Sequence, residues 1–322
     1  MLSKNLLRAL GGLFLLSQVA QAAAIPIRRD TGEDQSDDDA PEVSSSRTVI
    51  QPTGVVSLPS SSATPTVSPQ PGKGAVAGST EIIIPYYVYP EGGSWGPLEQ
   101  LIDTNPNMKF TVIVNPSSGP GSETLPDDNW RKAVPKLTTR PNVKVIGYVA
   151  TTYGGRPLSA VEKDISIYGN WPSASGDANF KVNGIFFDEG SAESDHTKVQ
   201  YYKDITSLAK QNQGLGPNNH VVINPGTVPD KAYLEIPDST VIFESPHSKF
   251  QEAIAGHNFD AIKNVDKAKL SSIVTAVPGG VNLGDLVTQL RDISGQIYLS
   301  STNDYMKYSS ALDDVAHILK AN

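Results

Sequence analysis

Two apolar runs of the sequence end in carboxylates. Residues 184–187 run directly into Asp188 and Glu189, and residues 241–243 run into Glu244. A buried strand that stops on an acid delivers the carboxylate to one rim of its sheet, so two parallel strands of this kind bring their acids to the same rim. Two converging carboxylates are the minimum equipment for cleaving a glycosidic bond. These three acids are therefore the first candidates for catalysis.

The elements that must position these acids can be read from the same sequence. Apolar, β-branched runs recur after residue 80, with polar or amphipathic stretches between them. Near-continuous apolar runs fit strands that are covered on both faces, as in parallel sheets. We expect eight strands, at 82–88, 110–114, 143–149, 182–188, 220–223, 241–244, 272–276 and 296–299.

The stretches between the expected strands predict helices. Val199, Tyr202, Ile205 and Leu208, for example, recur at the spacing of one helix face. Alternation of eight strands with helices predicts a (β/α)8 barrel. A doubly wound open sheet is the alternative, because residues 229–236 leave room for only a short helix between the fifth and sixth strands.

Polar and aromatic residues gather where the expected strands end, which is the active face of such a barrel. Amides suit hydrogen bonds to sugar hydroxyls, and aromatic rings suit the C–H face of a pyranose. The candidate substrate-binding residues are Tyr86, Tyr89, Trp95, Asn115, Tyr148, Asn224 and His247. Because neighbours on a strand point to opposite faces, some of the tyrosines near residue 86 are expected to pack beneath helices instead.

The same residues also have purely structural interpretations. An Asp-Glu pair after a strand fits a helix N-cap and a first-turn acid, and Glu244 could pair with Lys249. The two asparagines precede prolines and also fit simple turns, and His247 fits a surface position. Acids at the ends of two expected strands favour catalysis over these interpretations.

Composition excludes several classes of function. Cysteine is absent, which removes disulfides, thiol catalysis and cysteine metal sites. The net charge is −8, and residues 1–80 carry six basic and seven acidic residues, so the acidity belongs to the rest of the chain. No basic stripe suggests nucleic acid as a partner. The five histidines are scattered, and phosphate-loop and zinc-helix motifs are missing, so we expect no cofactor and no metal.

The N-terminal region predicts export. Lys4 and Arg8 precede an apolar run at 10–16 and a small-residue cleavage site at 20–22, which together predict a signal peptide over residues 1–22. Residues 23–80 are acidic and then rich in Ser, Thr and Pro, as in a disordered linker. We expect a secreted monomer, extracellular or in the cell wall, with no membrane span after signal cleavage and one catalytic domain over residues 81–322.

Several motifs carry a family resemblance. They are Ile-Pro-Tyr-Tyr-Val-Tyr-Pro at 84–90, Val-Asn-Pro-Ser-Ser-Gly-Pro-Gly at 114–121, Val-Ile-Gly-Tyr-Val at 145–149, Gly-Ile-Phe-Phe-Asp-Glu at 184–189 and Ile-Asn-Pro-Gly at 223–226. In type and order they resemble the spherulin 4 (spherulation-specific) family, over essentially all of residues 81–322.

The resemblance implies a (β/α)8 barrel related to glycoside hydrolase family 135. The characterised fungal branch hydrolyses α-1,4-linked N-acetylgalactosamine in galactosaminogalactan, a polysaccharide of the cell wall and of biofilms. The essential acids of that branch correspond to Asp188, Glu189 and Glu244. From the activity of that branch, the resemblance also implies a polysaccharide as the partner.

We therefore expect a retaining two-carboxylate mechanism. Asp188 would be the nucleophile or ion-pair stabiliser and Glu244 the general acid/base, while Glu189 would tune its neighbour or bind substrate. The roles of Asp188 and Glu189 could be exchanged. Two other classes stay open: a carbohydrate-binding module without turnover, and a structural coat protein of spores or cell walls.

Overall fold

The computed structural model describes residues 80–321 of the chain. The predicted signal peptide (1–22) and the predicted linker (23–80), apart from its final residue, lie outside the described residues. Within the described part, every helix is too short or too polar to cross a bilayer.

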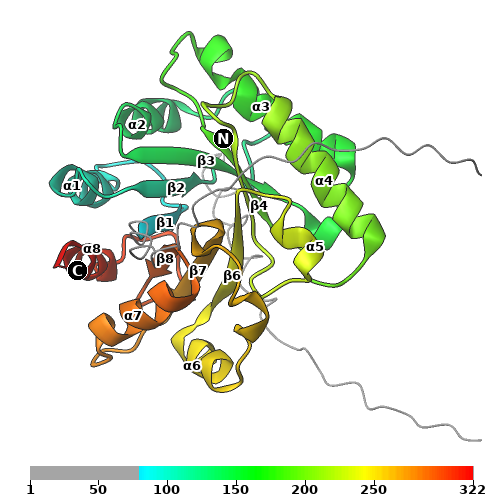
Figure 1. The fold of residues 1–322 in the computed structure, drawn as a ribbon. Helices are drawn as coiled ribbons and strands as arrows, with labels where there is room; N and C mark the ends of the chain where they lie inside the picture. Colours follow the sequence, from blue (N-terminus) through cyan, green and yellow to red (C-terminus); the bar gives the residue numbers. More distant parts are fainter. Residues whose placement is uncertain (1–79, 322) are drawn as a thin grey trace, which may run out of the picture. The chain divides into compact units, whose positions relative to one another are not determined.

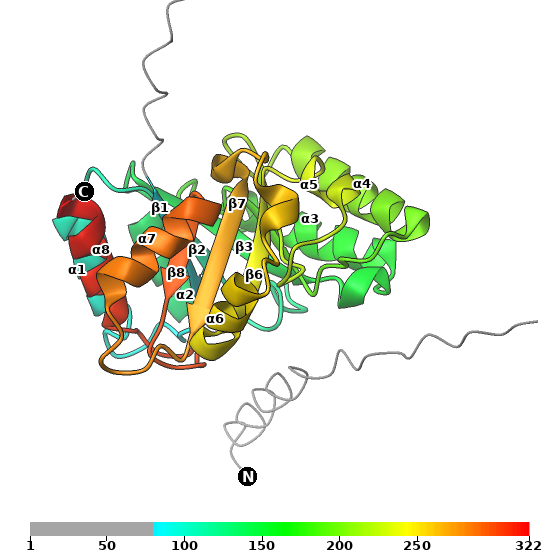
Figure 2. The ribbon, with the colours of Figure 1, turned by 60° about the horizontal axis from the view of Figure 1, so that its bottom comes forward.

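Eight parallel strands form a closed barrel in chain order (Figures 1 and 2). They are β1 (Glu81–Tyr86), β2 (Phe110–Val114), β3 (Val143–Ala150), β4 (Gly184–Asp188), β5 (His220–Ile223), β6 (Ser239–Pro246), β7 (Leu270–Thr275) and β8 (Gln296–Leu299). The ring closes because β8 pairs with β1, with Glu81 opposite Gln296 and Ile82 opposite Ile297. This closure confirms the predicted (β/α)8 barrel and excludes the open sheet.

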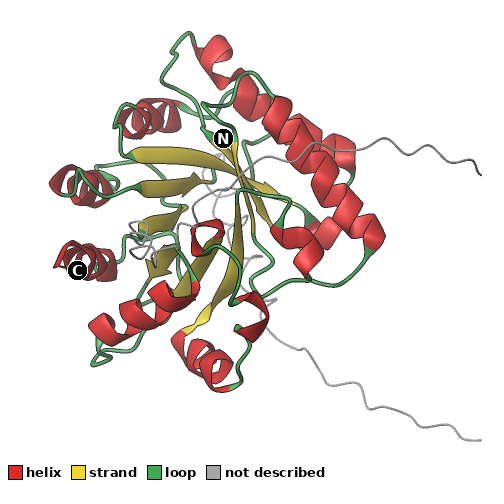
Figure 3. Ribbon diagram, in the orientation of Figure 1, coloured by secondary structure: helices red, strands yellow, loops and turns green. Residues whose placement is uncertain are grey.

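Helices surround the strands (Figure 3). They are α1 (Gly96–Thr104), α2 (Asp128–Thr138), α3 (Leu158–Ser175), α4 (His196–Gln211), α5 (Lys231–Leu234), α6 (His247–Ala255), α7 (Leu283–Ile293) and α8 (Ala311–Ala321), with 3-10 turns η1 (Thr152–Gly154), η2 (Asp260–Ile262) and η3 (Lys267–Lys269). The shortest α-helix, α5, has four residues and lies where the sequence left room for only a short helix.

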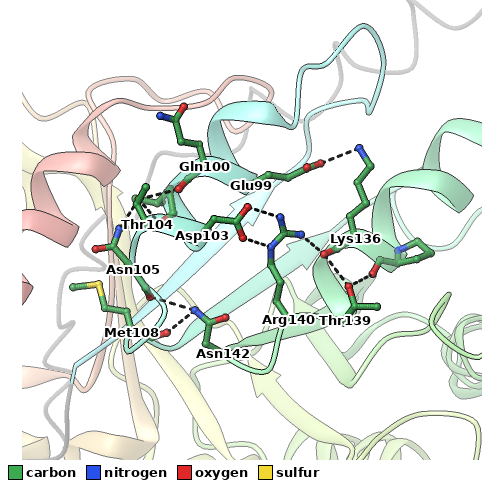
Figure 4. A network of polar contacts seen from close by, with 12 residues as sticks. Glu99, Gln100, Asp103, Thr104, Asn105, Met108, Lys136, Thr139, Arg140 and Asn142 are labelled. Carbon is green, nitrogen blue, oxygen red and sulfur yellow. Dashed lines mark hydrogen bonds and ion pairs between the residues drawn. The ribbon is translucent and has the colours of Figure 1, made fainter.

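Helices α1 and α2 and the turn after α2 are joined by polar contacts (Figure 4). The Arg140 guanidinium donates to both carboxylate oxygens of Asp103, at 2.6 and 2.7 Å. The Lys136 ammonium donates to Glu99 at 3.3 Å. Exposed ion pairs contribute at most about 1 kcal/mol each. These contacts therefore join α1 to α2 and the turn after it but add little to the stability of the fold.

Alternate strand residues point into the barrel, and at the end opposite the strand C-termini they form a polar floor. The hydroxyls of Ser239 and Ser271 lie 2.7 Å apart, and Ser271 donates to Oε1 of Gln296 at 2.7 Å. The Gln296 amide in turn donates to Glu81 at 3.3 Å. Counting in twos from Glu81 along β1 therefore puts Tyr87 on the inward face and Tyr86 on the face toward the helices.

Gly147 in β3 lets α3 lie close against the barrel. A Cβ added at Gly147 would come within 2.6 Å of the Tyr168 ring. The Tyr168 side chain is fully buried, and its hydroxyl donates to the carbonyl of Tyr148 at 3.1 Å. Because Gly147 faces the helix, alternation turns its neighbour Tyr148 into the barrel.

We predict that Gly147→Ala lowers the free energy of unfolding by about 2 kcal/mol, because a rigid buried ring must shift to admit the methyl group. Urea-induced unfolding followed by circular dichroism would measure the change. Gly96→Ala at the start of α1 is the matched control, since its added Cβ meets nothing within 4 Å. Equal stability of the two variants would contradict the packing argument.

Candidate active site

Two carboxylates from different strands meet at the C-terminal end of the barrel. Asp188 ends β4, Glu244 lies in β6, and Asn224 follows β5 between them. The Asn224 Nδ2 donates to Oδ1 of Asp188 at 2.7 Å and also to Oε2 of Glu244. Its Oδ1 accepts the backbone amide of Gly226 at 3.0 Å, which fixes the orientation of the amide group. One side-chain amide thus bridges both acids.

A β-bulge in β6 aims Glu244 into the barrel. The pairing with β7 runs regularly to Val241 opposite Ser271, then skips Ile242 and resumes with Phe243 opposite Ser272. Without the skipped residue, alternation would place Glu244 among the helices. Bulges commonly redirect a side chain beside an active site. The shift instead turns Phe243 outward, where its ring packs 5.3 Å from the ring of Phe250 in α6.

Tyr305, from the segment between β8 and α8, holds the other oxygen of Glu244. Its hydroxyl donates to Oε1 of Glu244 at 2.6 Å. Its carbonyl accepts the backbone amide of Tyr87 at 3.1 Å, and the two rings meet edge to face at 5.6 Å. Both carboxylate oxygens of Glu244 therefore accept hydrogen bonds, from Tyr305 and from Asn224.

Two further tyrosines enclose Asp188. Tyr148 hydrogen-bonds Asp188, and its ring lies 5.7 Å from that of Tyr87. Burial first, and the charge of Asp188 second, raise the pKa of both hydroxyls well above their ordinary value. Both tyrosines therefore remain neutral donors beside the acids.

Asp188 itself holds a proton unusually well. Burial, with the charge of Glu244 as the second cause, raises the pKa of its carboxyl to about 7. Hydrogen bonds from the Glu189 backbone, Tyr148 and Asn224 act in the opposite direction but do not outweigh burial. The Asp188 carboxyl can therefore hold or release a proton near neutrality, as a group that transfers protons in an active site must.

Glu189 makes different contacts from its neighbour. Its backbone is left-handed, with φ of +55°. Its Oε2 accepts the backbone amide of Thr152 at 3.1 Å, and its carbonyl accepts the amide of Tyr153 at 2.7 Å. Glu189 is thus bound to the turn that follows β3.

Three of the expected aromatic ligands lie away from the acids. Tyr86 and Trp95 are 1% and 3% exposed, so neither ring can stack on a sugar. Tyr86 donates to the carbonyl of Ser94 at 3.1 Å, and its ring packs 5.6 Å from that of Trp95. The hydroxyl of Tyr89 donates to Asp127, the N-cap of α2, at 2.8 Å. For Tyr86 the structural reason is strand alternation, which sends it to the helices and Tyr87 to the barrel, whereas Tyr89 and Trp95 follow the end of β1.

Two polar candidates also have local partners. The side chain of Asn115 accepts the amide of Gly119 at 2.8 Å, so it forms the turn that its Asn-Pro sequence allowed. His247 begins α6 and lies 3.4 Å from the amide of Gln251. Of the ten predicted site residues, the structure gathers Asp188, Glu244, Asn224 and Tyr148, with Glu189 bound to the adjacent turn.

Two residues of the cluster, Tyr87 and Tyr305, were not among the predicted ligands. Counting inward positions along β1 identifies Tyr87, whereas nothing in the polar segment around Tyr305 marks it. Within residues 80–321, no group of three or more histidine, aspartate or glutamate side chains is arranged to hold a metal ion.

We predict that Asp188→Asn stabilises the protein in a pH-dependent way. The folded-state pKa is raised, so ionising Asp188 costs stability that is lost as the pH rises from about 4 through about 7. Asparagine never ionises, so the variant should melt at least about 3 °C above wild type at pH 8, with little difference at pH 4. Thermal melts across this range would test it. Glu162→Gln, an exposed acid of α3, should show no such trend, and a pH-independent Asp188→Asn offset would contradict the argument.

Known proteins resemble this chain in sequence and in fold. The family model described as Spherulation-specific family 4 matches residues 81–319. Spherulin-4 of Physarum polycephalum is 34% identical over 176 residues, 54% of this chain, and the aligned part spans about half (48%) of that relative. The crystal structure of Aspergillus clavatus Sph3 in complex with GalNAc has a TM-score of 0.73 and 39% identity, covering 76% of this chain and 99% of that chain. The chain therefore belongs to the spherulation-specific family 4.

Proposed function

We propose that this protein is a glycoside hydrolase that cleaves α-1,4-linked N-acetylgalactosamine or galactosamine within a polysaccharide of the galactosaminogalactan type. The observation that carries the proposal is the pair of carboxylates, Asp188 and Glu244, bridged by Asn224. The GalNAc bound to the 39% identical Sph3 supports the sugar class. The predicted signal peptide is the basis for expecting the enzyme outside the cell or in the cell wall.

The spacing of the two acids supports a retaining mechanism. Both accept from the same amide nitrogen, and two acceptors at ordinary hydrogen-bond length from one NH2 group lie roughly 5 Å apart. Retaining glycosidases separate their carboxyls by about 5–5.5 Å, and inverting ones by about 6.5–9.5 Å to admit a water. One carboxylate would therefore attack the anomeric carbon directly.

The reaction uses one proton and two carboxyls. As the attacking carboxylate bonds to the anomeric carbon, the bond to the leaving sugar oxygen breaks and the other carboxyl protonates that oxygen. Water then hydrolyses the glycosyl-enzyme bond, and the second group takes the proton back.

The position of the proton bears on which acid attacks. In the free protein the raised pKa of Asp188 favours the proton on that residue. Attack by Asp188, the assignment expected from the sequence, then requires the proton to pass to Glu244 when substrate binds. Attack by Glu244 requires no such transfer, and Tyr305 and Asn224 already hold that carboxylate in place.

We predict that Asp188→Asn and Glu244→Gln each lower kcat on purified galactosaminogalactan by about 100-fold or more, because each removes one half of the acid pair. Reducing ends released per enzyme would be measured, with circular dichroism to establish folding. Glu162→Gln should retain full activity. If the wild type binds the polymer but releases no reducing ends, the protein is a binding module and not a hydrolase. If it neither binds nor cleaves the polymer, a coat protein is favoured.

We predict further that the newly formed reducing end first appears in the α configuration, as retention requires. Proton NMR during the first turnovers would detect it, and a first-formed β anomer would overturn the retaining mechanism. With an aryl oligosaccharide and added azide, the variant that lacks the acid/base should yield a glycosyl azide of retained configuration. The variant that lacks the nucleophile should yield the inverted azide, so the pair of products assigns the two roles.

A further inference from the structure

Hydrogen bonds from backbone amides and from one side-chain hydroxyl join the turn after β3 to the end of β4. Thr151 donates its amide to the carbonyl of Asp188 at 3.0 Å, and its hydroxyl donates to the same carbonyl at 2.8 Å and to that of Glu189 at 2.9 Å. The amide of Tyr153 donates to the Glu189 carbonyl at 2.7 Å. The position of the turn is therefore coupled to that of the strand end that carries Asp188 and Glu189.

This turn is held in a conformation that its residues rarely adopt. Thr152 and Tyr153 both have left-handed backbones, with φ of +50° and +53°, and Glu189 opposite them has φ of +55°. Threonine and tyrosine avoid this region, and such residues persist only where their surroundings fix them. The carboxylate of Glu189 supplies such a contact, because its Oε2 accepts the amide of Thr152 at 3.1 Å.

This strained turn exposes the aromatic ring of Tyr153. Tyr153 is 53% exposed and is the one strongly exposed side chain among the phenylalanines, tryptophans and tyrosines of residues 80–321. After burial, the charges of Glu189, Asp188 and Glu244 are the causes that raise the pKa of its hydroxyl, so the ring lies within electrostatic reach of all three acids. An aromatic ring left open at the edge of an acid pair offers an apolar face to whatever the acids act on.

We propose that Glu189 is a positioning residue whose carboxylate fixes the Thr152–Gly154 turn, and that Tyr153, presented by this turn, is a stacking surface for a sugar ring beside Asp188 and Glu244. The inference rests on the proposed function and deepens it. It assigns Glu189 a contact with the protein backbone in place of a proton transfer. It also assigns the stacking role to a residue other than Tyr86 and Trp95, which are buried.

The chemistry of the contact sets what each side chain must retain. Stacking needs the ring of Tyr153 and not its hydroxyl. The contact made by Glu189 needs an acceptor oxygen and not a charge, and glutamine keeps that oxygen. A proton-transferring glutamate, by contrast, cannot be replaced by glutamine.

Tyr153 is tested with a short α-1,4-linked N-acetylgalactosamine oligosaccharide. Tyr153→Ala should raise KM about tenfold with kcat within about twofold, and Tyr153→Phe should restore the wild-type KM. Unchanged KM in Tyr153→Ala, or a phenylalanine variant as impaired as the alanine variant, would overturn the stacking role.

Glu189 is tested by the same kinetics. Glu189→Ala should raise KM at least as much as Tyr153→Ala. Adding Tyr153→Ala to Glu189→Ala should raise KM no further, because both changes remove the same contact, the stacking of Tyr153 on the sugar. Glu189→Gln should keep kcat within about threefold of wild type. A glutamine variant as inactive as Asp188→Asn would show that the carboxyl itself takes part in the chemistry and would overturn the positioning role.

A binding measurement separates this inference from the proposed function. Isothermal titration of the oligosaccharide into Glu244→Gln needs no turnover, and adding Tyr153→Ala or Glu189→Ala should weaken binding about tenfold there. Loss of this effect while wild type cleaves the substrate would reject the inference alone. Absence of cleavage with the effect intact would reject hydrolysis and keep the stacking surface.

Discussion

The arrangement at the barrel mouth depends on keeping two like charges close together. Asp188 and Glu244 would repel each other if both were ionised, and burial sharpens that repulsion. The amide of Asn224 bridges them, Tyr305 donates to one and Tyr148 to the other. Burial first, and the charge of Glu244 second, raise the pKa of Asp188 to about 7, so a proton on this carboxyl relieves the remaining repulsion. Burying the two acids side by side therefore also provides a carboxyl that can donate a proton.

Each supporting element serves that pair. The closed barrel brings the ends of β4, β5 and β6 to one rim. The bulge at Ile242 turns Glu244 inward, and Gly147 lets α3 approach so that Tyr168 holds the carbonyl of Tyr148. Apart from Tyr305, the site is built on strands and their first following residues, which are more rigid than long loops.

The sequence was sufficient for features that depend on patterns and insufficient for those that depend on register. The alternation of apolar runs with amphipathic stretches predicted the barrel, and the two apolar runs that end in acids predicted the strands that carry Asp188 and Glu244. Strand alternation, applied residue by residue, would also have replaced Tyr86 with Tyr87 among the predicted substrate-binding residues. The bulge in β6 could not be predicted, because the sequence Val-Ile-Phe-Glu at 241–244 fits a strand with Glu244 facing the barrel as well as one with Glu244 facing the helices. Tyr305 and the contacts of Glu189 depend on segments far apart in the chain meeting in space, which no local pattern records.

The site also bears on how the barrel stays closed. Two seams have only two paired positions each, β5 with β6 and β8 with β1. Both are crossed at the mouth by residues of the site, the first by Asn224 reaching Glu244 and the second by the Tyr87 amide reaching the Tyr305 carbonyl. Tyr305 follows the last strand of the barrel, so the site is incomplete until the segment after β8 has been synthesised and has folded against β1. Partly folded chains therefore lack a finished site, and catalytic competence becomes a readout of complete closure.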